Sequence, residues 1–79
     1  MYYVYILKSE KDDSLYKGVT INLKKRLTEH NSGSPIYSST KKPFKLIWYC
    51  AFTDKLRAYR FERYLKRGSG HAFTKKHLI

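Results

Sequence analysis

The segment from Tyr2 to Lys8, YYVYILK, is apolar or aromatic at nearly every position and is rich in residues that favour strands. A strand with one face in water alternates apolar and polar side chains, whereas a strand covered on both faces reads as a continuous apolar run. We therefore expect this segment to be a central strand with both faces buried. Because the chain has only 79 residues, one small domain over residues 1–79 must supply the cover on both sides.

Two further strands are predicted from alternation and β-forming residues. The segment 15–21 follows a polar turn and forms a hairpin with the first strand. The segment FKLIWYCAF, residues 44–52, is the third strand. Strict alternation puts one set of its side chains on a single face: Phe44, Leu46, Trp48, Cys50 and Phe52.

Helices are predicted from capping residues and apolar spacing. Asn22 is a good N-cap for a helix that stops at residues 31–33, with Leu23 and Leu27 on its apolar side and Arg26 and His30 beside them. A second helix starts at Thr53 or Asp54, runs to about residue 67 and stops at the GSG of residues 68–70. A short final helix follows. The predicted class is α+β, with a three-stranded antiparallel sheet flanked by helices in the order β-β-α-β-α-α.

Net charge points to a polyanionic partner. Seventeen lysines and arginines stand against six acidic residues, a formal net charge of +11. An excess of this size makes the compact state repel itself, and nucleic acid is the partner that fits best. A role in solubility alone is the alternative. No apolar run approaches the roughly 20 residues of a membrane span, and the lone Cys50 and the absence of a leader pattern lead us to expect a cytoplasmic protein.

Glu62 is the acidic residue best placed for chemistry, because it lies at the edge of the apolar stripe formed by Ala58, Phe61 and Leu65. A hard cation such as Mg²⁺ can be held by one carboxylate, with water and phosphate completing its shell. Glu62 and Lys66 are also spaced i,i+4, and ion pairs at this spacing are common on helix surfaces. From spacing alone the ion pair is the favoured interpretation.

The remaining candidates also have two interpretations each. Arg26 either grips a phosphate with its planar guanidinium or is one more basic residue in KKR. His30 either moves a proton or is a histidine at the edge of the core. The eight tyrosines mostly supply buried ring area, although a phenol near cations can orient a water.

The chain resembles the GIY-YIG nuclease superfamily, in its small single-domain branch of the UPF0213 or UvrC N-terminal type. The first half of the motif is Tyr3-Val4-Tyr5, with tyrosine in place of glycine, and the second half is Tyr16-Lys17-Gly18, with lysine in place of isoleucine. The blocks NLKKRLTEH, KKPFKLIWY, FERYLK and GSGHAF follow in family order. The resemblance spans essentially the whole chain and implies the same β-β-α-β-α-α fold.

By this resemblance, Tyr5 and Tyr16 lie close together on adjacent strands and orient or activate the attacking water. Arg26 contacts the scissile phosphate, and His30 takes part in proton transfer or phosphate contact. Glu62 becomes the single metal-binding carboxylate, for Mg²⁺ or Mn²⁺. Because the family role of this position outweighs spacing statistics, the resemblance turns the interpretation of Glu62 from ion pair to metal ligand. All five of these residues are then expected to face one cleft.

Gly18 matches the family glycine, which lets backbone approach the site closely. The resemblance implies a metal-dependent endonuclease that hydrolyses DNA phosphodiester bonds, in repair or recombination. A binding module without catalysis, and a subunit that needs a larger protein partner, are the alternatives; the preferred DNA structure and a weak homodimer are left open. The expected nucleic-acid-binding surface consists of Lys17, Lys24, Lys25, Lys41 and Lys42.

Overall fold

The computed structural model describes residues 1–31 and 43–78 of the chain. In these ranges the elements are, in order, β1 (Tyr2–Ser9), β2 (Leu15–Thr20), α1 (Leu23–Asn31), β3 (Phe44–Phe52), α2 (Lys55–Lys66), α3 (Gly68–Phe73) and a π-helical turn (Thr74–Leu78). The predicted α+β class and element order are confirmed. None of the helices in the described ranges is long and apolar enough to span a membrane.

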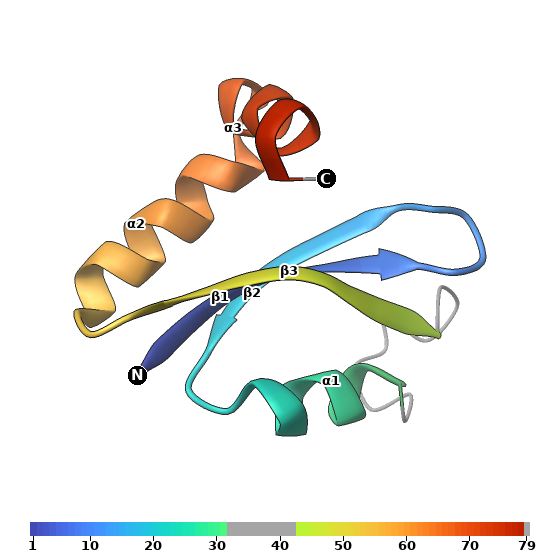
Figure 1. Cartoon of the computed structure of the whole chain (residues 1–79), viewed down its shortest axis with the longest axis horizontal. Helices are drawn as coiled ribbons and strands as arrows, with labels where there is room; N and C mark the ends of the chain where they lie inside the picture. Colours follow the sequence, from blue (N-terminus) through green and yellow to red (C-terminus); the bar gives the residue numbers. More distant parts are fainter. Residues whose placement is uncertain (32–42, 79) are drawn as a thin grey trace.

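The sheet is antiparallel with the strand order β2-β1-β3, so β1 is central as expected. Figure 1 shows α1 on one face of the sheet and α2 with α3 on the other. The long apolar run of β1 is explained by this layering, because a strand between two helical layers has no face in water. Val4, Tyr5, Ile6 and Leu7 are each at most 2% exposed.

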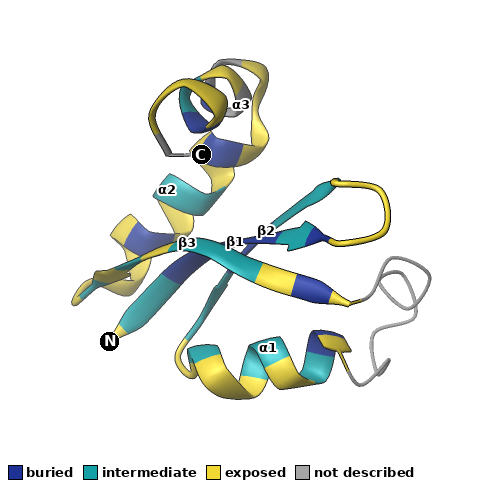
Figure 2. Ribbon diagram, turned by 45° about the vertical axis from the view of Figure 1, so that its right-hand side comes forward, coloured by how far each residue is buried: buried dark blue, intermediate teal, exposed yellow. Residues whose placement is uncertain are grey.

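The core is therefore divided by the sheet into two clusters. On the α2 side, Val4 and Ile6 pack with Ala58 and Leu65 of α2. On the α1 side, Tyr5 and Leu7 of β1 pack with Phe44, and half-buried leucines of α1 complete the cluster. In Figure 2 the outer side of α1 is exposed, whereas the residues at the centre of β1 are buried.

The predicted alternation along β3 is wrong in one respect. The ladder pairs Ile6 with Trp48 but Leu7 with Leu46, so Ile47 is an extra residue that bulges out of the register. A bulge of one residue reverses which side chains face which layer. As a result Phe44 and Leu46 pack on the α1 side, while Trp48, Cys50 and Phe52 pack on the α2 side.

The second helix ends near residue 67 as predicted, but the GSG segment at residues 68–70 is itself helical and forms the start of α3. Helix α2 ends at Lys66, with Arg67 as its C-cap in an extended conformation, and α3 begins directly at Gly68. The break is thus one residue long. Gly70 is buried against the last turn of α2, and its missing side chain lets α3 fold back onto that turn.

The two glycines of this segment give a matched pair of substitutions. A Cβ on Gly70 would collide with the carbonyl oxygen of Tyr64, whereas a Cβ on Gly68 would meet nothing within 4 Å. We expect Gly70→Ala to lower the free energy of unfolding by about 1–3 kcal/mol, a typical cost of overpacking. Gly68→Ala should leave it unchanged or raise it, because alanine favours helices. Urea unfolding measures both; equal effects would contradict the packing described for Gly70.

Candidate active site

Two phenols and an imidazole come together on the α1 side of the sheet. Tyr5 projects from β1, Tyr16 from β2 and His30 from the last turn of α1. The Tyr5 hydroxyl lies 3.4 Å from Nε2 of His30, and the His30 and Tyr16 rings meet edge to face with centroids 4.5 Å apart. The family resemblance predicted that these residues would lie close together, and the described geometry agrees.

The members of this cluster differ in their access to solvent. Tyr5 is 2% exposed and His30 is fully buried, whereas Tyr16 is half-buried and lines a surface pocket. His30 was expected at the border of the apolar face, but it is inside the core, beside the ring of Phe44. A substrate in the pocket can therefore reach Tyr16 directly, and Tyr5 and His30 lie behind it.

His30 carries an unusual polar atom. Its Nδ1 is buried and has no hydrogen-bond partner among the residues that the structure describes. Burial lowers the pKa of His30 from its ordinary value of 6.5; the charge of Arg26 lowers it further, and Glu29 raises it. The imidazole is therefore neutral at pH 7, and one of its nitrogens can accept a proton.

Gly18 is explained by the ring of Tyr5. The two residues are direct partners in the β1–β2 ladder. A Cβ on Gly18 would lie 2.5 Å from the hydroxyl oxygen of Tyr5 and 2.7 Å from Cζ. The space that glycine leaves open is thus filled by the phenol itself, which lies over the bare backbone of β2.

Arg26 lies one helical turn before His30, at the surface of α1. Its side chain is 41% exposed and its guanidinium lies 3.7 Å from a carboxylate oxygen of Glu29. An exposed pair at this distance contributes little stability, so the guanidinium can turn to a phosphate at small cost. Arg26 and Tyr16 line separate pockets, with Lys25 and Asn22 beside Arg26.

The expectation that Glu62 shares a cleft with the tyrosines and His30 is wrong, because it lies on α2, and so on the opposite face of the sheet from α1 (Figure 1). Its side chain is 16% exposed, and its carboxylate forms an ion pair of 2.6 Å with Nζ of Lys66. The pair considered from spacing is therefore present. Lys66 and Tyr16 line one pocket along β2, the edge strand, which connects the neighbourhood of Glu62 with the cluster on the other face.

Glu62 offers one carboxylate, whereas a hard divalent cation needs about six oxygen ligands. No group of three or more His, Cys, Asp or Glu residues in the described ranges could hold a metal. A single carboxylate still fits Mg²⁺ or Mn²⁺ when water and a substrate phosphate complete the shell. Lys66 is paired with Oε2 of Glu62, so a cation bound there would compete with it for that oxygen.

The predicted nucleic-acid-binding lysines are found in different environments. Lys24 and Lys25 are exposed on α1. Lys17 is 8% exposed, and its Nζ donates a 2.8 Å hydrogen bond to the carbonyl oxygen of Leu65 at the end of α2. Adjacent residues of a strand point to opposite faces, so Lys17 points away from the face that carries Tyr16. Lys41 and Lys42 lie outside the described residues.

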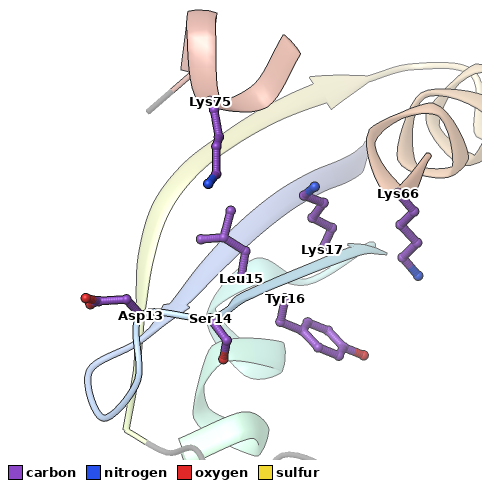
Figure 3. Close-up of a pocket in the computed structure, with 7 residues that line it drawn as sticks. All are labelled: Asp13, Ser14, Leu15, Tyr16, Lys17, Lys66 and Lys75. Carbon is purple, nitrogen blue, oxygen red and sulfur yellow. The ribbon is translucent and has the colours of Figure 1, made fainter. Parts of the chain in front are cut away.

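Sequence reasoning missed two residues with clear positions in the fold. Asn31 clamps the start of β3, because its side chain donates to the carbonyl oxygen of Phe44 and accepts from the Phe44 amide. Lys75, in the π-helical turn, lines the same pocket as Tyr16 (Figure 3). Asparagine after a helical run indicates only a stop, and no sequence signal places the π-helical turn over β2.

Comparisons with known proteins identify relatives over nearly the full chain. A family model described as the GIY-YIG catalytic domain matches residues 1–76. A UPF0213 protein of Clostridium perfringens is 46% identical over 68 residues, which cover 85% of this chain and 72% of that protein. Another, from Staphylococcus haemolyticus, is 41% identical over 66 residues, or 82% of this chain and 79% of that protein.

A solved structure is also similar. The solution NMR structure of a UPF0213 protein from Bacillus halodurans matches with a TM-score of 0.59 and 32% sequence identity. The match covers 99% of this chain and 87% of that one. The three-stranded antiparallel sheet with its flanking helices is therefore shared with a measured fold.

Substitution of Gly18 tests the packing of the Tyr5 ring. We expect Gly18→Ala to lower the free energy of unfolding by about 1–3 kcal/mol, because the phenol must move from its place against His30. In a Tyr5→Leu background, which removes the ring, the same substitution should cost clearly less. Urea unfolding of the four proteins measures the coupling; an equal cost in both backgrounds would mean that the ring is not the obstacle.

The buried imidazole predicts a pH dependence of stability. Because the pKa of His30 is lowered in the folded state, the unfolded chain binds a proton below about pH 6.5 that the folded chain does not. The free energy of unfolding should therefore fall between pH 7.5 and pH 5.5, and fall less in His30→Gln. His77→Gln, at an exposed histidine, should keep the wild-type dependence. If all three proteins respond alike, His30 is not the group responsible.

Proposed function

Because this chain belongs to the GIY-YIG family of nuclease domains, we propose that it is an endonuclease that hydrolyses DNA phosphodiester bonds with the help of a divalent cation. The observation that carries the proposal is the cluster of Tyr5, Tyr16 and His30, in which only Tyr16 reaches the surface pocket. The net charge of +11 supports a nucleic-acid substrate. A role in DNA repair or recombination is part of the same proposal.

In this mechanism Tyr16 orients the water that attacks phosphorus, since it is half-buried, lines the pocket and has its ring held edge to face by His30. Tyr5 and His30 are positioning residues: both are buried, and the neutral imidazole keeps the Tyr5 hydroxyl in place at 3.4 Å. Arg26 leaves its weak pair with Glu29 and offsets the charge that builds up on the phosphate oxygens. A divalent cation on Glu62 would supply Lewis-acid stabilisation of the same charge and of the leaving oxygen.

A second candidate function is nucleic-acid binding without cleavage. The specific observation in its favour is the ion pair between Glu62 and Lys66, which already satisfies the proposed metal ligand. In that case Glu62→Ala would leave binding to DNA intact or strengthen it, because a negative charge is removed from a basic surface. No cation would then produce cleavage. A larger protein partner and a weak homodimer remain further proposals.

Plasmid nicking distinguishes the two functions. We expect nicking with Mg²⁺ or Mn²⁺ that EDTA abolishes, and a loss of about 100-fold in Tyr16→Phe, Arg26→Gln or Glu62→Gln, the usual effect of removing one group that stabilises a transition state. Glu10→Gln is the matched control, because Glu10 is an exposed carboxylate in the β1–β2 turn. Equal residual nicking in every preparation would identify a contaminating nuclease and count against the proposal.

A further inference from the structure

The pocket that Tyr16 lines continues on the α2 side of β2, where the mechanism above uses none of its lysines. The β1–β2 turn, β2, the end of α2 and the π-helical turn all contribute to its lining. Three of its lining residues are lysines: Lys17, Lys66 and Lys75. They belong to three different elements, β2, α2 and the π-helical turn, and lie at one pocket only because the chain folds.

Lys17 is the buried member of the group. Its ammonium donates to the carbonyl oxygen of Leu65, and burial lowers the pKa of this lysine. The hydrogen-bond partner is thus a neutral carbonyl and not a carboxylate. A desolvated cation with a neutral partner is stabilised when an anion approaches, because attraction between charges is strong where water is excluded.

Lys75 and Lys17 line the pocket from different elements. In Figure 3 the side chain of Lys75 descends toward β2, and that of Lys17 rises from β2 on the same side as Leu15. The carboxylate of Asp13, the acidic residue in the lining, points away from both and lies 3.8 Å from Nζ of Lys8. Lys66 extends to the other side, where Glu62 holds it.

We propose that the pocket between Lys17 and Lys75 binds a backbone phosphate of the nucleic-acid strand, next to the phosphate handled at Tyr16. This inference rests on the proposed function, because it assumes that the substrate passes Tyr16. Tyr16 lines the same pocket, and β2 is the edge strand, so a strand of nucleic acid can pass from one face of the sheet to the other along this edge. A phosphate accepts hydrogen bonds from several donors and carries the charge that the lysines need.

The test compares two neighbouring lysines. Lys75 lines the pocket, while Lys76 is exposed and is not part of its lining. A plot of log affinity against log salt concentration has a negative slope. Removing one lysine that neutralises a phosphate of duplex DNA makes this slope less steep by about 0.9. Binding of a short DNA duplex is measured in EDTA at several salt concentrations. Lys75→Gln should make the slope less steep by about 0.9, and Lys76→Gln should leave it near the wild-type value.

Equal slopes for the two variants would overturn the inference. Lys17→Met, which keeps most of the aliphatic packing but removes the charge, should make the slope less steep by as much as Lys75→Gln does when circular dichroism confirms that it is folded. The binding assay contains no free metal, so its result is independent of cleavage. Nicking by the wild-type protein with unchanged slopes would sustain the nuclease and refute this pocket, whereas a less steep slope without any nicking would sustain the pocket and refute the nuclease.

Discussion

The whole architecture depends on β1 having no face in water. Its even-numbered side chains, Val4 and Ile6, pack beneath α2, and the odd-numbered Tyr5 and Leu7 pack against α1. A chain of this length buries only a modest fraction of its surface, so covering one strand on both faces is an economical way to build a core. The same constraint drives a phenol inside, where its hydroxyl needs a polar partner. His30 supplies that partner, and the site begins there.

Much of this fold could be predicted from the sequence, because periodicity and capping depend on local residues. The bounds of β3 and the N-cap of α1 at Asn22 are such cases: the Asn22 side chain accepts from the amide of Lys25. The bulge at Ile47 could not be predicted, since the pairing with β1 decides which residue is extra. The start of the final helix at Gly68 could not be predicted either, because glycine permits a break without requiring one.

The candidate site shows the same division between local and non-local information. The family resemblance named Tyr5, Tyr16 and His30, and the structure brings these three together. The position of Lys17 could have been foreseen, because strand alternation already separates it from Tyr16. The position of Glu62 could not have been foreseen. It depends on which face of the sheet α2 covers, and that is decided by how the whole chain packs.

The sheet therefore separates the proposed phosphate chemistry into two halves, and the edge strand β2 joins them. Tyr16 faces one half and Lys17 the other, although they are adjacent in sequence. Lys66 occupies the carboxylate of Glu62 at 2.6 Å, and it also lines the pocket that Tyr16 reaches. In the proposed mechanism Glu62 would hold the cation, and the Lys66 ammonium would then be available to a phosphate. Binding of a cation at Glu62 and of a phosphate at Lys66 would then favour each other, because both separate the same ion pair.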